Sequence, residues 1–454
     1  KSYVLQHLMR SVYSKQSMRK NTTILLLLAI AVSSCQRANY SSADDSKALK
    51  LIKKSEVERI ERILSADDMQ GRRTGTPGID KAADFISSEF KKIGLQPLEA
   101  SGIYKQQFQM IKPKSLSASA IFDRQEIDAQ NIVAITSSPS LKVNNQSGFE
   151  KVYIKSGGQL TTEANKFMQA KKNYLVIVDT SFSKTFSRLN SLKRQFFKSD
   201  NSVVFVMSTL DPTVYNITAT HEITEMPLAN VVGMIPGKSR RDEYVIFSGH
   251  YDHLGYGKAV NGDSLYNGAN DDAAGTTAMM VLAKYYKALN NNERTLVFAA
   301  FTAEEIGGFG AQYFSRQLAP EKVVAMFNIE MIGTESKWGK NSAYITGYDK
   351  TDMGKILEKN LVGSIFRFHA DPYTEQNLFY RSDNATLARL GVPAHTISTA
   401  KMDSEPHYHK PSDEIGTLDL NNMTEIIRAI AISSKTIISG KDTPSRVNTA
   451  DLRR

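Results

Sequence analysis

The chain has 454 residues, 41% of them hydrophobic and 23% charged, which is typical of a globular protein of two or three domains. Its one cysteine, Cys35, excludes an intramolecular disulfide framework and a cysteine-based zinc site. The net charge is +10, but five basic residues and no acidic one lie in the first 34 residues, which leaves 52 basic against 47 acidic residues, so no nucleic-acid partner is expected.

Residues 1–34 predict a secretory signal. An apolar run of nine residues, 24–32, directly follows Arg19 and Lys20. It is too short for a helix that crosses ~30 Å of hydrocarbon, whereas a short apolar run behind basic residues is typical of a signal peptide. We expect translation to start at Met18, with the residues before it upstream of the protein.

The end of this segment, Val32-Ser33-Ser34-Cys35, resembles a bacterial lipoprotein signal. The resemblance implies that Cys35 is lipidated and anchors the protein to a membrane of the bacterial cell envelope, on the periplasmic or surface side. Polar residues 35–48 would then be a tether. The alternative is cleavage near Ser34 that leaves Cys35 unmodified.

Two helical patterns precede a β-rich segment. Apolar residues recur at helical spacing over 47–64 and again up to Ile93, where Gly94 ends the pattern. Short β-branched runs alternate with polar stretches from 110 to 228. We predict a separate inserted β-rich domain there, with few catalytic candidates. Its basic segment 184–198 is interpreted as a solvated face, with contact to a polyanion or a lipid headgroup as the alternative. His221 is interpreted as a structural residue.

Continuous apolar strands alternate with helical patterns from 229 onward, which predicts an α/β fold with a mostly parallel central sheet flanked by helices. This domain would comprise residues 49–109 and 229–440, followed by a tail at 441–454. The expected strands are 244–247, 296–301, 324–332, 343–346 and 394–398. The expected helices are 274–289, 309–318, 350–362, 383–390 and 419–439.

Acidic and histidine side chains gather at or just after the ends of these strands. They fall in the segments 249–253, 267–275, 302–307, 328–333 and 406–413. Burying such groups is costly unless a metal ion or protons pair them, and sites in parallel sheets lie beyond the carboxyl ends of the strands. Histidine and carboxylate ligands without thiolates suit Zn²⁺. Two cations ~3.5–4 Å apart need a bridging carboxylate and two ligand sets.

Four motifs together resemble the M28 zinc aminopeptidases. Gly-His-Tyr-Asp-His, Asn-Gly-Ala-Asn-Asp-Asp-Ala-Ala-Gly, Ala-Glu-Glu-Ile-Gly and Tyr-His-Lys-Pro-Ser-Asp occur in the order of that family. The resemblance covers about 45–110 and 229–440, and 110–228 more faintly resembles a protease-associated domain. It implies a zinc-exopeptidase-like fold and a hydrolase that removes N-terminal residues from peptides.

The resemblance also implies two divalent metal ions, expected to be Zn²⁺. Asp271 would bridge them, and the four remaining ligands would be His250 and Glu330 for the first ion, Glu305 and His409 for the second. Glu304 would act as the general base on a metal-bridged water. Tyr408 would donate a hydrogen bond to the developing oxyanion.

Supporting roles follow from the same resemblance. Asp252 and Asp272 would orient the metal ligands without binding metal themselves. Asp252 would do so by accepting a hydrogen bond from the other ring N–H of His250. The Asp271–Asp272 peptide is expected to be cis, as in relatives. Arg381, Ser382 and Asp383 resemble a substrate-pocket segment. Four histidines are expected to be supporting, exposed or structural: His253, His407, His369 and His395.

Glu330 is the main departure from the family pattern, which has aspartate there. Its extra methylene moves the carboxylate by about 1.2–1.5 Å, which puts the affinity and identity of the first metal in question. Two alternatives stay open. One is glutaminyl cyclisation, which the same fold supports with one zinc ion, and the other is a metal-free binding protein.

Overall fold

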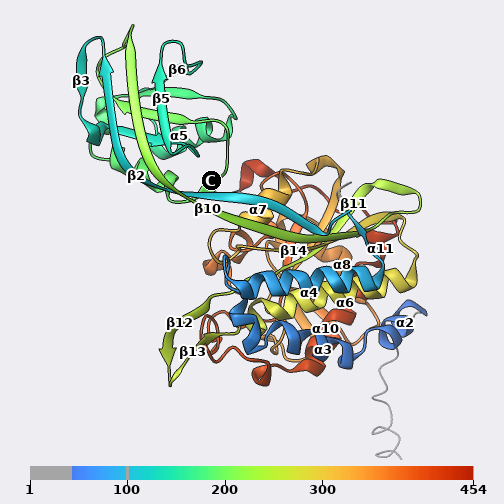
Figure 1. The fold of residues 1–454 in the computed structure, drawn as a ribbon. Helices are drawn as coiled ribbons and strands as arrows, with labels where there is room; N and C mark the ends of the chain where they lie inside the picture. The colour runs from blue at the N-terminus through green and yellow to red at the C-terminus, as the bar shows by residue number, and fades with distance from the viewer. Residues whose placement is uncertain (1–42, 99–101, 453–454) are drawn as a thin grey trace, which may run out of the picture.

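The computed structural model describes residues 43–98 and 102–452. A layered α/β domain carries a smaller β-rich lobe beside it (Figure 1). One twisted sheet runs through the α/β domain in the strand order β17-β16-β18-β15-β11-β14-β10-β2-β3. The expected fold class, an α/β fold with a central sheet flanked by helices and an inserted β-rich unit, is confirmed. The sheet is mixed and not mostly parallel as expected, because β10 pairs antiparallel with β14 and β2, and β16 antiparallel with β18.

Four parallel strands form the middle of this sheet. β11 pairs in parallel with β14 and β15, and β15 pairs in parallel with β18. β14, β15 and β18 are buried along their whole length without alternation, because both faces of the sheet are covered. Their bounds are Arg240–His250 for β11, Arg294–Phe301 for β14, Val323–Ile329 for β15 and Ala394–Ser398 for β18.

Helices cover both faces of the sheet. Phe247, Phe298 and Phe327 point into one core, against α3, α4, α6, α8 and α10. The neighbouring Ile246 and Val297 point into the other core, against α7 and α9. The helix bounds are α3 Lys54–Leu64, α4 Pro77–Ile93, α6 Ala274–Leu289, α7 Phe309–Ser315, α8 Met353–Leu361, α9 Asn384–Ala388, α10 Leu420–Ser433 and α11 Lys435–Ile438.

The two ends of the described chain pack against the α/β domain. Helix α2, Ala43–Leu51, begins inside the predicted tether, and its Ala48 is fully buried. The helix predicted over 47–64 is therefore two helices. At the other end, Val447 and Leu452 of the predicted tail join the second core. The predicted signal and Cys35 lie outside the described residues.

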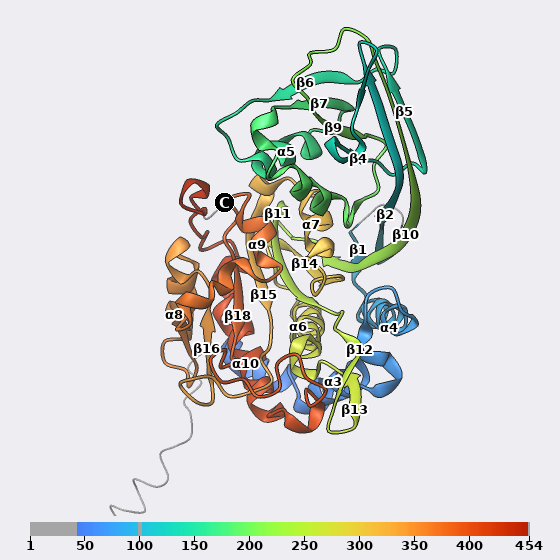
Figure 2. The same cartoon turned by 90° about the vertical axis from the view of Figure 1, so that its left-hand side faces the viewer.

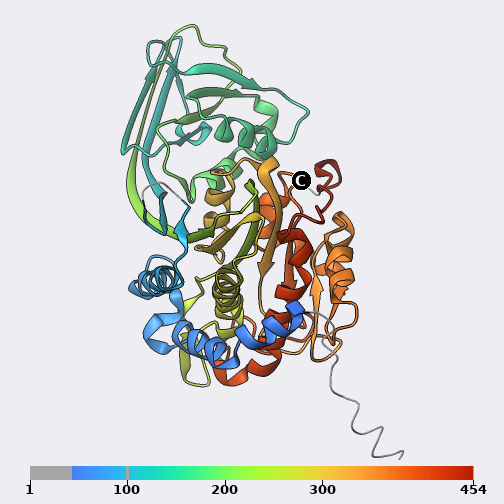
Figure 3. The ribbon, with the colours of Figure 1, turned by 90° about the vertical axis from the view of Figure 1, so that its right-hand side faces the viewer.

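Two long antiparallel strands connect the α/β domain to the insert (Figures 2 and 3). β2, Lys105–Phe122, pairs with β10, Tyr215–Ile235, from Val231 back to Tyr215. Residues 231–235 of β10 also pair with β14 of the central sheet, and residues 216–220 pair with β5 of the insert. The boundaries expected at 110 and 228 thus fall inside two strands that belong to both units.

The insert adds a second sheet in the order β4-β9-β7-β6, with helix α5 (Leu160–Gln169) beside it. Apolar side chains on its two faces form two small cores. The bounds of the insert strands are β3 Gln125–Ile127, β4 Ile132–Ile135, β5 Ser140–Asn144, β6 Glu150–Ile154, β7 Tyr174–Val178, β8 Phe196–Phe197 and β9 Val203–Met207. The remaining strands are β1 Gln96–Pro97, β12 Gly255–Val260, β13 Asp263–Tyr266, β16 Ser342–Ile345 and β17 Arg367–Ala370.

Within residues 43–98 and 102–452, no helix combines the length and the apolar character that a membrane span needs.

Candidate active site

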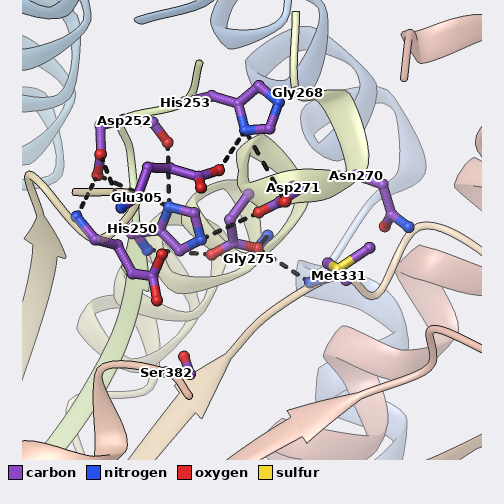
Figure 4. Close-up of polar contacts among 12 residues, drawn as sticks. His250, Asp252, His253, Gly268, Asn270, Asp271, Gly275, Glu305, Met331 and Ser382 are labelled. Carbon is purple, nitrogen blue, oxygen red and sulfur yellow. Dashed lines mark hydrogen bonds and ion pairs between the residues drawn. The ribbon is translucent and has the colours of Figure 1, made fainter. Parts of the chain in front are cut away.

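The side chains expected to form the site meet at one edge of the sheet, and Figure 4 shows His250, Asp271 and Glu305 among them. Each belongs to a strand end, to the turn before α6 or to the loop after β18: His250, Asp271, Glu304, Glu305, Glu330 and His409. Ala303, Met331 and His409 have left-handed backbone φ angles of 59°, 52° and 53°. Such angles are uncommon outside glycine and cluster at functional sites. They turn the chain sharply next to the glutamates that follow β14 and β15.

Asp271 lies at the centre of the cluster. Its Oδ1 is 3.2 Å from Nε2 of His250, and its Oδ2 is 3.2 Å from Nε2 of His409. The peptide between Asp271 and Asp272 is cis, as expected. The two carboxylate oxygens of Asp271 therefore face two different groups of side chains, which is the arrangement required of a bridging ligand.

The first group contains His250, Asp271 and Glu330, whose ligand atoms all lie within 4.8 Å of one another. His250 is 1% exposed, and its Nε2 has no hydrogen-bond partner. Oε2 of Glu330 also lacks a partner. Despite its longer side chain, Glu330 reaches this group, because it directly follows the last residue of β15.

The second group contains His253, Asp271 and Glu305, again with ligand atoms within 4.8 Å of one another. Nδ1 of His253 lies 2.8 Å from Oε1 of Glu305, yet neither atom has hydrogen-bond geometry to a partner. His409 joins them, with Nε2 3.3 Å from Oε2 of Glu305. We expected His253 to be a supporting or exposed residue. Instead it is 1% exposed and aims a nitrogen into the group.

These two groups fit divalent cations. Ligand atoms ~2.0–2.2 Å from a tetrahedral zinc ion stand roughly 3.3 Å apart. The contacts of Asp271 with His250 and His409 are close to this spacing, at 3.2 Å each. Buried nitrogens and oxygens without partners are costly, and a cation would satisfy them. The donor set of imidazoles and carboxylates suits zinc.

The local electrostatics also favour a cation. Burial raises the pKa values of Glu304 and Glu330, and it raises the pKa of Asp383 to about 8. Burial alone would lower the pKa of His409, but its contacts with Asp271 and Glu305 raise it to about 10. Asp271 and Glu305 therefore stabilise the protonated, positively charged form of His409.

Asp252 acts differently from the sequence prediction. Its carboxylate lies 3.8 Å from Nδ1 of His250, and that nitrogen is nearer, at 3.1 Å, to the backbone carbonyl of Asp252. The carboxylate instead accepts the backbone N–H groups of Glu304 at 3.0 Å and Glu305 at 3.3 Å. The Thr74 hydroxyl also donates to it, at 3.2 Å. Asp252 therefore positions the turn that carries both glutamates.

Two further buried aspartates fix the backbone of the site. Asp272 accepts the backbone N–H groups of His250 at 3.1 Å, Gly275 at 2.9 Å and Met331 at 3.1 Å. Asp413 accepts those of Asn270 at 2.8 Å and of Asp271 at 3.0 Å. Asp413 lies in a motif that we quoted, but its contact is with a segment some 140 residues away, so the sequence could not assign it a role.

Arg72 is another residue that the sequence analysis missed. It is fully buried, and its guanidinium donates to the backbone carbonyls of Tyr251 at 2.8 Å, Asn267 at 2.7 Å and Gly268 at 2.8 Å. These carbonyls belong to the segments that carry His253 and Asp271. The glycine-rich loop of residues 71–78 thus ties the two ligand-bearing turns together.

A pocket of about 410 Å³ opens beside the first group of ligands, and Glu330 and Tyr408 line it. Its other walls include Met331, Tyr344, Leu378, Met402, Arg381 and Ser382. The ring of Tyr408 stacks on His409, with centroids 4.0 Å apart. Asp383 does not line the pocket. It is 1% exposed, and neither of its carboxylate oxygens has a partner.

Comparisons with known proteins agree with this geometry. Residues 230–433 match the family model of Peptidase family M28. This match covers less than half of the chain. A probable leucine aminopeptidase of Trichophyton verrucosum (strain HKI 0517) is 28% identical over 206 residues, or 43% of this chain and 54% of the relative. Aminopeptidase YwaD of Bacillus subtilis (strain 168) is 25% identical over 204 residues, 42% of this chain and 41% of the relative.

The chain thus spans about half the length of these curated relatives. Two solved structures cover more of it. An aminopeptidase from Aneurinibacillus sp. strain AM-1 has a TM-score of 0.50 and 17% identity over 90% of this chain and 98% of its own. BSAP, a zinc aminopeptidase from Bacillus subtilis, has a TM-score of 0.52 and 17% identity over 86% and 97%. At these identities the likeness establishes the fold alone.

Proposed function

We propose that this protein is a metal-dependent aminopeptidase that hydrolyses N-terminal residues from peptides. One observation carries the proposal: the two carboxylate oxygens of Asp271 face two separate sets of buried donors. His250 and Glu330 would hold one divalent cation, and Glu305 and His409 a second, with Asp271 shared. His253, which the sequence analysis did not count as a ligand, would add a donor to the second set.

When bound, two divalent cations supply a water of lowered pKa and polarise the scissile carbonyl. The residues of the chain do the rest. Glu304 would accept the proton of the attacking water and return it to the leaving amine. The hydrogen bonds from the backbone of Glu304 and Glu305 to Asp252 hold that turn in place. Tyr408, on the wall of the neighbouring pocket, would donate to the developing oxyanion.

The pocket beside Glu330 supports an apolar residue at the cleaved position. Tyr344, Leu378 and Met402 line it and belong to one small hydrophobic cluster. An apolar substrate side chain would be removed from water there, which is worth ~25 cal/mol per Å² of buried apolar surface.

The test is hydrolysis of a set of aminoacyl amides and short peptides by the purified protein. We expect release of free N-terminal residues, with apolar ones preferred, loss of activity in a chelator and recovery with Zn²⁺. Peptides with an acetylated N-terminus are the matched control and should stay intact. Equal cleavage of the acetylated peptides, or full activity after complete metal removal, would overturn the proposal.

Two other functions are separated by the same assay. Glutaminyl cyclisation would release pyroglutamyl peptides from substrates with N-terminal glutamine and would need one zinc ion. A metal-free binding protein would hold no metal after purification. The donor sets favour the peptidase, because all five predicted ligand positions carry competent side chains, and Asp271 faces both sets.

We further propose that Cys35 is the lipidated N-terminus and anchors the protein to a membrane of the cell envelope. The support is the sequence Val32-Ser33-Ser34-Cys35 behind a short apolar run. In bacteria that make the protein, Cys35→Ala should abolish labelling by a radioactive fatty acid and move the protein from the membrane to the soluble fraction. Unchanged membrane association of this variant would contradict the anchor.

A further inference from the structure

The insert contains a cavity that the peptidase site does not use. It measures about 680 Å³ with its open mouth included. It lies between residues 115–118 of β2, residues 219–221 of β10, strand β4 and the segment around Lys193. Its polar lining residues include Ser115, Ser117, Gln130, Asn190, Lys193 and His221. We call it the insert cavity.

His221 is buried in the wall of this cavity, where its ring hydrogen-bonds to the backbone of Ala134 but leaves one nitrogen without a partner. It is 4% exposed, and its Nδ1 has no hydrogen-bond partner. The register between β2 and β10 shifts between Thr220 and His221, and the backbone N–H of His221 leaves the ladder to donate to Pro139 at 2.8 Å. Bulges of this kind re-aim a side chain and are over-represented beside functional sites. A buried polar atom without a partner is costly, so a ligand that pairs with it gains affinity.

Lys193 supplies the positive charge of the cavity. Its ammonium donates to the Ser115 hydroxyl at 2.8 Å, and among the described residues it forms no ion pair with a carboxylate. Burial lowers the pKa of Lys193. Burial, and next the charge of Lys193, lower the pKa of His221. The two side chains are therefore near each other, and neither is neutralised by an acid.

The acidic residue that precedes the cavity wall does not compensate for this charge. Asp128 accepts the backbone N–H of Gln130 at 2.9 Å and its side-chain amide at 3.1 Å. Asp128 forms no ion pair with Lys193, and Lys193, which donates one N–H to Ser115, keeps two of its three N–H donors for other groups. The Ser115 hydroxyl, which accepts from Lys193, keeps its own proton to donate.

We propose that the insert cavity binds a small organic anion. Its carboxylate or phosphate would accept hydrogen bonds from Nζ of Lys193 and Oγ of Ser115, while a neighbouring polar group of the same molecule pairs with Nδ1 of His221. The proposal does not depend on the peptidase activity, because none of these residues belongs to the metal-binding groups. It also replaces the interpretation of His221 as a structural residue and of the segment 184–198 as only a solvated face.

The experiment is calorimetric titration of the metal-loaded protein with inorganic phosphate, glycerol 3-phosphate and lactate. We expect saturable one-to-one binding of at least one probe, and the probe that binds tells whether phosphate or carboxylate is the preferred oxyanion. Lys193→Met should weaken that binding about tenfold or more, the loss expected when a charged hydrogen-bond donor is removed. His221→Phe should weaken it less, because it removes one uncharged partner.

Lys184→Met is the matched control, since Lys184 is an exposed lysine of the same basic segment. It should bind the probe as the unchanged protein does, and all three variants should keep the peptidase activity and the melting temperature. Two results would overturn the proposal: no saturable binding of any probe, or equal affinity in Lys193→Met and Lys184→Met. Neither result would affect the peptidase assay, so the two proposals fail separately.

Discussion

The α/β domain, called the peptidase domain below after its proposed function, and the insert place buried polar groups in opposite ways. At the site of the peptidase domain, the acidic residues Asp271, Glu304, Glu305 and Glu330 converge with histidines. Among the described residues, no lysine or arginine forms an ion pair with these four acids. In the insert cavity, Lys193 and His221 converge without an acid. The first arrangement calls for cations and the second for an anion. Each is costly in isolation and is explained by what it binds.

The two regions also differ in how their residues are spaced along the chain. The ligands of the peptidase domain come in short motifs at strand ends, such as 249–253 and 302–307, because parallel strands bring their carboxyl ends to one edge. The polar residues of the insert cavity come singly, from β2, from the segment before β8 and from β10. A motif can be recognised in a sequence, whereas a site built from single residues becomes visible only in the fold.

The largest effect should come from Glu304, the proposed general base. Glu304→Gln keeps the size of the side chain but cannot accept a proton, so kcat should fall by roughly 10²–10⁴-fold. The bound metal, measured by mass spectrometry, should stay the same. Glu321→Gln, an exposed glutamate of the same domain, is the control. Turnover of Glu304→Gln within about tenfold of the unchanged protein would remove Glu304 from this role.

The second prediction concerns how the free energy of unfolding changes with pH, and it tests Glu61, a buried acid outside the proposed metal site. Glu61 of α3 is fully buried, accepts one hydrogen bond from Thr277 at 2.9 Å, and burial raises its pKa from 4.5 to about 8. The folded chain therefore keeps this proton up to about pH 8, while the unfolded chain loses it near pH 4.5. Between these values the unfolded state binds fewer protons, so the free energy of unfolding falls as pH rises.

The fall attributable to Glu61 should be a few kcal/mol, since one pKa unit corresponds to about 1.4 kcal/mol. It should be complete near pH 8 and absent below pH 4.5. Glu61→Gln has no proton to lose, so denaturant unfolding at pH 5 and pH 8 should show a smaller difference than in the unchanged protein. Glu126→Gln, an exposed glutamate of the insert, should leave the pH dependence as it was. An unchanged slope in Glu61→Gln would contradict the account.

The sequence predicted more of the peptidase domain than of the insert. The central strands and their covering helices follow from continuous apolar runs and helical spacing, and the motifs at the strand ends contain the histidines and carboxylates that meet in the fold. The strand expected over 324–332 ends at Ile329, because Met331 adopts a left-handed turn that no propensity requires. The role of Asp252 depended on which of two acceptors lies nearer to His250, a difference of 0.7 Å between 3.1 and 3.8 Å.

The insert resisted prediction for a physical reason. The middle of each strand is exposed: in β2 it holds lysines and serines, and in β10 it holds Glu222 and Glu225. The change in composition marks a change in burial, not the end of a strand. The boundaries predicted at 110 and 228 therefore fall within continuous strands. His221 was likewise invisible as a ligand candidate, because the bulge that aims it is a property of the pairing.

The third prediction concerns metal affinity, and it compares variants of two buried histidines. His253 faces the second group of ligands and His221 the insert cavity. His253→Phe should lower the affinity of one metal ion by about 10–100-fold, the size of effect known for residues that support a metal site. Zinc competition with a chelator and the visible spectrum of the cobalt form measure this without relying on activity. His221→Phe should change neither. Equal metal affinity in both variants would exclude His253 from the site.

The smallest effect should come from Lys193→Met, measured as stability without any ligand. The lysine gives up one hydrogen bond to Ser115 but no ion pair, and methionine fills similar space without the cost of burying a charge. The free energy of unfolding should therefore change by no more than about 0.5 kcal/mol, as for substitutions away from packed or paired groups. A loss of about 2 kcal/mol would mean that Lys193 stabilises the insert. Its charge would then have a structural use, and the contrast between a cation-binding and an anion-binding region would no longer hold.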